Sequence, residues 1–165
     1  METIAVYWEP KIRVYGLMTE TGLSLYTLTF PVERLARWGG LLKSLGQKGT
    51  EFLLVNLQQA SAGSMQLCLV PMAGVGAAEV AELLAKGLEN EIVGHLQVTE
   101  PVELIYLHGP HFQDRYGIAE AALRPLYNAG IPILTTGCAG TSVSIVVSEN
   151  RAREVAACLA ETFVL

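Results

Sequence analysis

The sequence predicts an α+β fold in which one βαββαβ unit occurs twice in tandem. Two pairs of similar segments indicate the repeat: "LKSLGQKGTEF" at residues 42–52 matches "LRPLYNAGIPI" at residues 123–133, and "EVAELLA" at residues 79–85 matches "EVAACLA" at residues 154–160. In both copies, short β-rich apolar runs alternate with stretches of helical apolar periodicity. Hydrophobic residues make up 51% of the 165 residues and charged residues 16%, which is enough apolar material for a packed core.

The first copy is expected to hold strands at residues 22–30, 51–58, 65–71 and 92–98, with helices at residues 31–45 and 77–88. The apolar face of its first helix consists of Leu35, Trp38, Leu42 and Leu45. Gly39 and Gly40 lie in the middle of this helix, where each glycine costs about 1 kcal/mol relative to alanine. We therefore expect another backbone to pack closely against these two glycines.

The second copy is expected to hold strands at residues 102–109, 131–136 and 141–149, a turn at 137–140, and helices at residues 117–129 and 150–164. Its first helix has an apolar face of Ile118, Ala119, Ala122, Leu123, Leu126 and Tyr127. Gly130 is a typical C-terminal glycine, whereas Pro125 is expected to kink or shorten the helix. The last helix is expected to bury Ala152, Val155, Ala156, Leu159 and Phe163.

The second copy has no residues left for a closing strand, whereas "KIRVYGLMT" at residues 11–19 precedes the first copy without a partner. We expect this N-terminal strand, over residues 11–18, to complete the second sheet. The prediction is two ferredoxin-like units, one at residues 19–99 and one at residues 100–165. Such sheets leave one face or an edge uncovered by helices, so we expect a homodimer.

The charge, the termini and the cysteines exclude several classes of function. The net charge is −5 and no basic run occurs, which argues against a nucleic-acid partner. No apolar stretch reaches the ~20 residues of a membrane span, and the N-terminus lacks the pattern of a signal peptide. The three cysteines are far apart, without a CxxC pair, and are expected to be reduced thiols in a cytoplasmic protein.

Three segments carry a resemblance to a known family: "VYGLMTETGLSLYTLTF" at residues 14–30, "DRYGIAEAALRPLYNAGIPIL" at 114–134 and "TSVSIVVSENRAREVAACLAETFVL" at 141–165. The chain resembles the tandem ACT domains of the aspartokinase C-terminal regulatory region, without the kinase domain. In that family the first strand likewise completes the second ACT unit. The resemblance implies a regulatory protein rather than an enzyme, with no cofactor. It also implies an amino-acid effector, lysine or threonine, at ACT–ACT interfaces, and a separate aspartokinase as a candidate partner.

The resemblance also implies the binding residues. Asp114, Arg115 and Gly117 match the family's loop in the second unit. Backbone N–H groups at the helix start after Gly117 are suited to bind the effector carboxylate, since they lack intrahelical acceptors and carry partial positive charge. A glycine there lets the ligand approach the backbone closely, and Asp114 or Glu33 is suited to pair with the ammonium group.

The matching residues of the first unit are Glu33 and Arg34, although Leu35 and Ala36 replace the family's Pro-Gly pair. Asn56 and Gln58 lie on the strand that offers amide side chains to the effector in the family. An amide can both donate and accept hydrogen bonds, so these two residues suit either end of an amino acid. Because the Pro-Gly pair is missing, a ligand-free interaction or scaffold module with vestigial pockets is the alternative.

A catalytic or metal-binding interpretation rests on His108, His111 and Asp114. Zinc sites converge three or four ligands, and no HExxH spacing occurs here, so surface or effector-contacting histidines are favoured. Cys138 has no base placed beside it by the sequence. The glycines of "LVPMAGVGAAEV" at residues 69–80 lack the third position of a dinucleotide fingerprint, which is occupied by Glu79. We therefore expect no catalytic residue and no metal.

Overall fold

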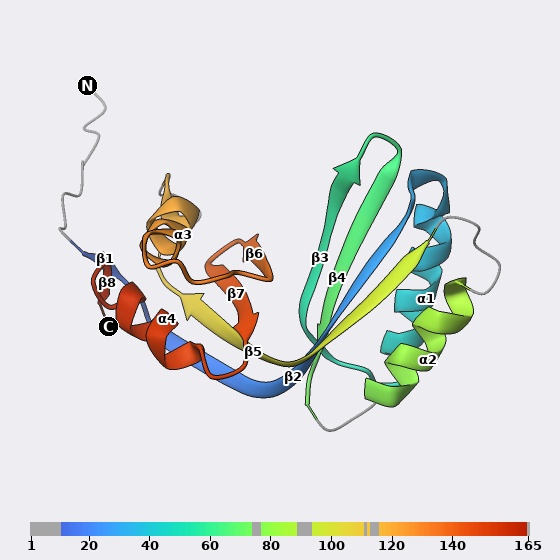
Figure 1. Ribbon diagram of the computed structural model, residues 1–165, viewed down its shortest axis with the longest axis horizontal. Coiled ribbons are helices and arrows are strands. Elements are labelled where there is room, and N and C mark those ends of the chain that lie inside the picture. The colour runs from blue at the N-terminus through green and yellow to red at the C-terminus, as the bar shows by residue number, and fades with distance from the viewer. Residues whose placement is uncertain (1–10, 74–76, 89–93, 111, 113–115, 165) are drawn as a thin grey trace.

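The computed structural model describes residues 11–73, 77–88, 94–110, 112 and 116–164. Figure 1 shows two halves joined by long central strands. The elements in chain order are β1 (Ile12–Arg13), β2 (Gly16–Pro31), η1 (Val32–Arg34), α1 (Leu35–Gln47), β3 (Phe52–Ser61), β4 (Ser64–Pro71), α2 (Ala77–Leu88), β5 (His95–His108), α3 (Ile118–Asn128), β6 (Thr135–Ala139), β7 (Ser142–Ser148), α4 (Ala152–Leu159) and β8 (Phe163–Val164).

One antiparallel sheet of six strands, in the order β3-β4-β2-β5-β7-β6, runs through the whole molecule. We call α1, α2, β3 and β4 with the adjoining ends of β2 and β5 the first half. The second half contains α3, α4, β6, β7, the other ends of β2 and β5, and the short parallel pair β1–β8.

The N-terminal segment completes the second half, as the sequence predicts. Gly16 to Glu20 of β2 pair with Leu104 to His108 of β5, whereas Leu25 to Thr29 of the same strand pair with His95 to Thr99. The predicted architecture of two tandem βαββαβ units with this strand exchange is therefore confirmed. The boundaries at residues 19–99 and 100–165 stay a proposal, and both fall inside strands that serve both halves.

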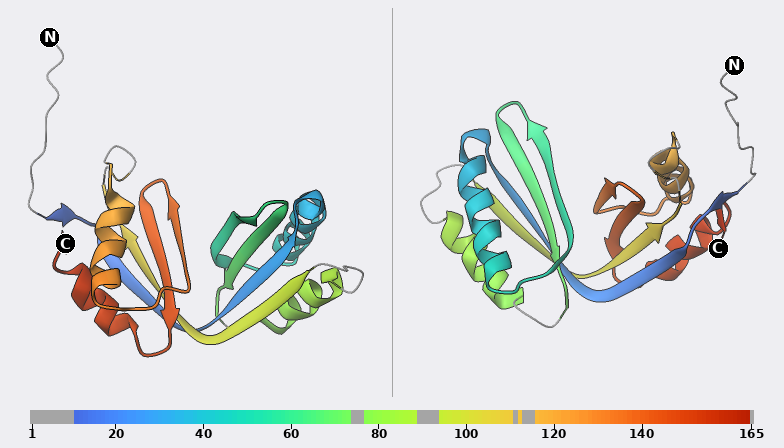
Figure 2. Two further views of the ribbon diagram at one scale, coloured as in Figure 1. Left: turned by 45° about the horizontal axis from the view of Figure 1, so that its top comes forward. Right: turned by 180° about the vertical axis from the view of Figure 1, so that it is seen from behind.

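The sheet bends strongly where the two halves meet (Figures 1 and 2). The pairing of β2 with β5 shifts register on both sides of Leu23, and Gly22 adopts a left-handed backbone with φ of +68°. A local irregularity of this kind increases twist and bends a strand. The bend turns the helices of each half outward, so that the outer strands β3 and β6 face each other on the inner side.

Three apolar clusters fill the molecule, one under each helix pair and one inside the bend. The cluster of the first half contains Tyr26, Leu28, Phe30, Trp38, Leu45, Leu67, Leu69, Val80 and Leu84. The cluster of the second half includes Ile105, Leu107, Ala122, Leu126, Val143, Ile145, Val147, Val155, Leu159 and Phe163. The cluster inside the bend, which we call the inner cluster, consists of Leu23, Leu25, Leu54, Cys68, Val70, Val102, Leu104 and Val146.

A buried carboxylate fixes the start of α4. Glu103 on β5 is only 7% exposed, and its Oε2 accepts hydrogen bonds from the backbone N–H groups of Arg151 at 2.9 Å and Ala152 at 2.6 Å. Because the first N–H groups of a helix have no intrahelical acceptor, this carboxylate satisfies two of them and complements the helix dipole.

The end of the chain differs from the predicted long helix. α4 ends at Leu159, and Phe163 and Val164 form β8, which pairs with β1. Phe163 is buried as predicted, but it reaches the core from a strand. The segment predicted as a strand from residue 131 becomes one only at Thr135, because the N–H of Ile131 bonds to Leu126 O and closes the end of α3.

Two predictions about helix faces were wrong. Tyr127 is 83% exposed and Leu35 is 40% exposed, so both lie outside the apolar faces to which periodicity assigned them. Gly39 and Gly40 are exposed, and a Cβ at either position would meet open space. The close approach occurs instead at Gly87 of α2, where a Cβ would lie 2.5 Å from Cη2 of Trp38.

None of the described helices is both long and apolar enough to cross a membrane.

Candidate functional site

A cavity of about 270 Å³ opens at the start of α3 in the second half. Its walls come from the segment before α3, the first turn of α3, and the β6–β7 hairpin: Phe112, Tyr116, Gly117, Ile118, Ala119, Cys138, Gly140, Ser142 and Val143. Gly117 is the only one of the predicted binding residues in the described part of this wall.

Gly117 gives the start of α3 an open backbone. Its φ of +81° lies in the left-handed region that favours glycine, and it has no side chain to cap the helix. The first intrahelical bond runs from Ala121 N to Gly117 O at 2.8 Å. The N–H groups of the first turn therefore have no intrahelical acceptor and, with the helix dipole, favour an anionic group such as a carboxylate.

The ring of Phe112 forms one wall because the chain folds back on Gly109. A Cβ at Gly109 would lie 2.3 Å from Cε1 of Phe112, so only glycine permits this packing. The ring also meets Phe163, with 6.4 Å between centroids. Phe112 is 6% exposed and thus joins the cavity to the core of the second half.

The β6–β7 hairpin supplies the opposite wall. Cys138 is exposed, but partial desolvation of its thiol raises the pKa, which favours the protonated sulfur. The hydroxyl of Ser142 donates to Ala139 O at 3.0 Å within the hairpin. The wall as described is therefore mainly apolar, with polar groups concentrated at the helix start.

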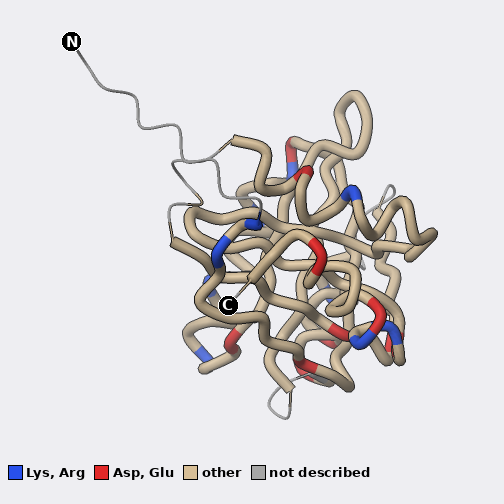
Figure 3. Tube along the Cα trace, turned by 90° about the vertical axis from the view of Figure 1, so that its left-hand side faces the viewer, with Lys and Arg blue, Asp and Glu red and all other residues tan. Residues whose placement is uncertain are grey.

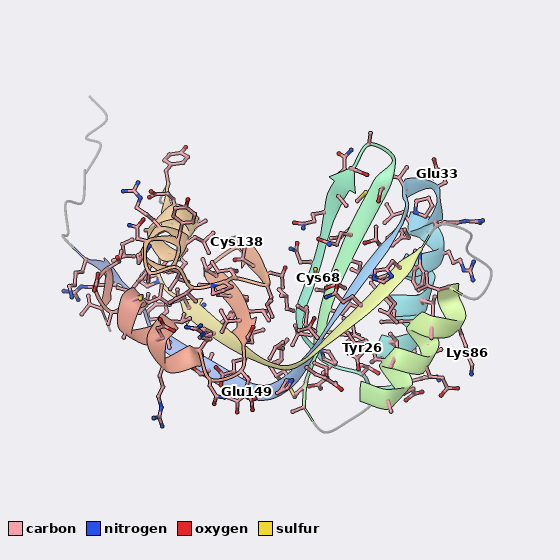
Figure 4. The ribbon with its side chains drawn as sticks, in the orientation of Figure 1. Tyr26, Glu33, Cys68, Lys86, Cys138 and Glu149 are labelled. Carbon is pink, nitrogen blue, oxygen red and sulfur yellow. The ribbon has the colours of Figure 1, made fainter. Side chains whose placement is uncertain are left out.

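The other predicted binding residues lie elsewhere or fall outside the description. Asp114 and Arg115 are outside the described residues, as is His111. Glu33 and Arg34 form the exposed turn η1 of the first half. Figure 4 shows Glu33 beside the start of α1, in the half opposite to Cys138.

Asn56 and Gln58 both lie on β3 of the first half, and both amides are already engaged within the chain. Asn56 Nδ2 donates to Thr136 O of β6 at 3.0 Å, and Gln58 Nε2 donates to Gln66 Oε1 at 2.7 Å. Within one chain, the described candidates therefore divide between the halves, with Gly117 in the second and the rest in the first.

His108 belongs to an aromatic cluster. Its Nδ1 lies 3.2 Å from Thr141 Oγ1, and its ring stacks at 10° to that of Tyr106 with centroids 6.2 Å apart. The centroid of the Tyr15 ring lies 5.4 Å from that of His108. Within the described ranges, no three or more His, Cys, Asp or Glu side chains gather as metal ligands would.

Figure 3 shows basic residues interspersed with acidic ones on the face toward the viewer.

Sequence reasoning missed Phe112, Cys138 and Ser142 as cavity residues. Periodicity assigned Cys138 to a turn, whereas β6 continues through it to Ala139. The pairing of Cys138 with Val143, a core residue, places the thiol on the helix-covered face of the sheet. The glycine at position 109 was a usable signal, since glycine at a strand end often marks close packing of another group.

No protein-family model and no curated protein matched the chain. Solved structures, in contrast, superpose on most of this chain. The ligand-free regulatory subunit of aspartate kinase from Thermus thermophilus superposes with a TM-score of 0.76 at 13% identity, covering 92% of this chain and 99% of that one. Aspartate kinase from Synechocystis gives a TM-score of 0.75 at 18% identity, covering 92% of this chain and 27% of that one.

Aspartokinase III from E. coli, in complex with lysine and aspartate, gives a TM-score of 0.60 at 16% identity, with coverage of 93% and 33%. The chain thus spans almost a whole regulatory subunit but only a third or less of these kinases. The resemblance seen in the sequence is confirmed by the three-dimensional structure: this chain has the fold of the aspartate kinase regulatory subunits.

Proposed function

We propose that the chain is a stand-alone ACT-type regulatory protein that binds an amino acid and acts on a separate protein, for which an aspartokinase is the candidate. The observation that carries this proposal is the match in fold over the full length of a regulatory subunit. Such a subunit lacks a kinase domain, and we propose that this chain likewise performs no phosphoryl transfer. Its effect on a partner would then depend on the ligand.

The cavity at the start of α3 is the proposed site for the effector. The N–H groups after Gly117 receive the carboxylate, and Asp114 in the preceding segment is the proposed partner of the ammonium group. The effector side chain lies against Phe112, Val143 and Cys138. The described part of this wall holds no carboxylate that would pair with a second ammonium group, which favours threonine over lysine.

A second copy of the chain is proposed to complete the effector site, because the candidates of the first half lie apart from the cavity. The outer strand β3 carries no charged residue from Phe52 to Ser61, and Val55 and Leu57 are 50% and 42% exposed. An uncharged outer strand with exposed apolar side chains is a ready surface for strand pairing. In a homodimer formed there, Glu33, Arg34 and Gln58 of one copy become available to a ligand held by the other.

A thermal-shift screen of the twenty amino acids tests the proposal, with the oligomer mass measured by light scattering. An effector at a hundred times its Kd adds about 2.7 kcal/mol to the free energy of unfolding. We expect one amino acid to raise the melting temperature selectively and Gly117→Ala to abolish that rise, because the new side chain occupies the space before α3.

The matched control is Gly130→Ala at the other end of the same helix. Gly130 also has a positive φ, +69°, so both variants carry the same kind of backbone strain. Gly130→Ala should lower the melting temperature yet retain the ligand-induced rise. If no amino acid stabilises the chain, the effector proposal is wrong.

A ligand-free scaffold is the second candidate function, and one observation favours it. The amides of Asn56 and Gln58, which the resemblance assigns to the effector, are both hydrogen-bonded inside the chain. A flat thermal-shift screen from a dimeric protein would support this function.

A further inference from the structure

The outer strands of the six-stranded sheet meet each other, although they lie at opposite ends of its strand order. Figure 1 shows β3 and β6 facing each other across the bend. Two contacts are resolved there: the hydrogen bond from Asn56 Nδ2 to Thr136 O at 3.0 Å, and the packing of Leu54 over Gly137. A Cβ at Gly137 would lie 2.8 Å from Cδ1 of Leu54, so the absence of a side chain at 137 permits the approach.

We propose that this contact, which we call the β3–β6 latch, sets the angle between the two halves and is the element that switches between two states. In the latched state, Leu54 is 7% exposed and belongs to the inner cluster with Val146 of β7. In the open state, the same residues separate and the bend of the sheet relaxes at the register shifts around Leu23.

The composition of the contact suits a reversible switch. The strands are joined by side-chain contacts, among them a neutral hydrogen bond and the packing of Leu54, whereas a ladder of backbone bonds joins every neighbouring pair in the sheet. Loss of a single neutral hydrogen bond changes an equilibrium by only about two- to tenfold. Opening also separates Leu54 from Val146 in the inner cluster, but it leaves both helix-covered cores intact.

Asn56 links the latch to a ligand, and this step rests on the proposed function. One N–H of its amide donates to Thr136 O, while Oδ1 has no hydrogen bond within the described part of the chain. In the proposed homodimer, an effector held in the cavity of the other copy can donate to Oδ1 through a group other than the ammonium assigned to Asp114, and the bond to Thr136 stays intact. Because the bond to Thr136 fixes the Asn56 amide only in the latched state, such an effector binds that state more tightly and raises its population.

The latch is tested by the distance between the outer helices in the ligand-free full chain. Spin labels at Lys43→Cys on α1 and Ala157→Cys on α4 report this distance, with Cys138 and Cys158 replaced by serine and alanine and with the buried Cys68 retained. We expect a latched and an open component in the distance distribution of the parent, and a shift toward the longer distances in Gly137→Val and in Asn56→Leu.

Two further variants make the result specific. Gln58→Leu removes an amide from the same strand that bonds to Gln66 and not to β6, so its distribution should match that of the parent. Leu54→Ala should restore the parent distance when combined with Gly137→Val, because it makes room for the new side chain. Circular dichroism shows that each variant is folded. Unchanged distances in both Gly137→Val and Asn56→Leu would overturn the latch.

The link to the effector has a separate outcome. An amino acid that binds should increase the fraction of latched distances in chains that contain Asn56. It should leave the distance distribution of Asn56→Leu unchanged. A ligand that raises the melting temperature without altering the distances would overturn the coupling alone. If no amino acid binds, the proposed function fails, while the ligand-free distances still decide on the latch.

Discussion

The two halves derive from one repeated unit, yet their first helices begin differently. In the second half, α3 starts at a left-handed glycine and opens onto a cavity. In the first half, the chain enters α1 through the 3-10 turn η1, where Leu35 and Ala36 stand at the positions of the family's Pro-Gly pair. The comparison shows that the two halves share the βαββαβ arrangement but differ at the start of the first helix, where only the second half has a left-handed glycine beside a cavity.

The largest expected effect concerns the support of the second half. Glu103→Ala leaves two N–H groups at the buried start of α4 without an acceptor, and we expect a loss of about 2–3 kcal/mol in the free energy of unfolding. Urea denaturation measures the loss. The exposed ion pair of Glu120 with Arg124 provides the control, since Glu120→Ala should change stability by at most about 0.5 kcal/mol. Equal effects of the two substitutions would contradict the role of the buried cap.

An aromatic ring packs on a glycine in each half, and alanine substitutions compare the two sites. Gly87→Ala drives a methyl group into Trp38 between α1 and α2, and we expect a loss of about 1–3 kcal/mol in the free energy of unfolding. Gly109→Ala displaces Phe112, which lies at a cavity wall and has room to move, so its loss of stability should be smaller.

Ligand binding should rank these two variants in the opposite order. We expect Gly109→Ala to weaken the effector more than Gly87→Ala, as measured by calorimetric titration, because it reshapes the cavity. A larger binding loss in Gly87→Ala would place the effector site in the first half.

The smallest expected effect is a difference in thiol chemistry. The raised pKa of Cys138 lowers its thiolate fraction, so alkylation by iodoacetamide at pH 8 should be slower than that of an exposed cysteine with an unshifted pKa. The reaction should accelerate as the pH rises above 9. Figure 4 shows Cys138 in the second half and Cys68 in the first, where Cys68 is buried and should not react in the folded chain. Mass spectrometry of peptides measures both rates. An effector in the cavity should slow the reaction at Cys138 further.

Much of the fold was accessible from the sequence because its signals are local. The helix from Ala77 to Leu88 matches its predicted bounds, and the internal repeat together with the strand count placed the N-terminal strand in the second sheet. The end of the chain escaped prediction because β8 depends on pairing with β1, about 150 residues away. The cavity escaped for the same reason, since Phe112 and Cys138 line one cavity only after the chain folds back on Gly109.

The sharing of β2 and β5 has a consequence for how the protein can be dissected. A cut between residues 99 and 100 would divide β5 and leave the second half without the segment from Gly16 to Glu20. The second repeat is therefore not a detachable module, because a fragment of residues 100–165 would lack a strand of its own sheet. Because β2 and β5 cross from one half to the other, we expect the tandem pair to be the smallest unit in which both sheets are complete.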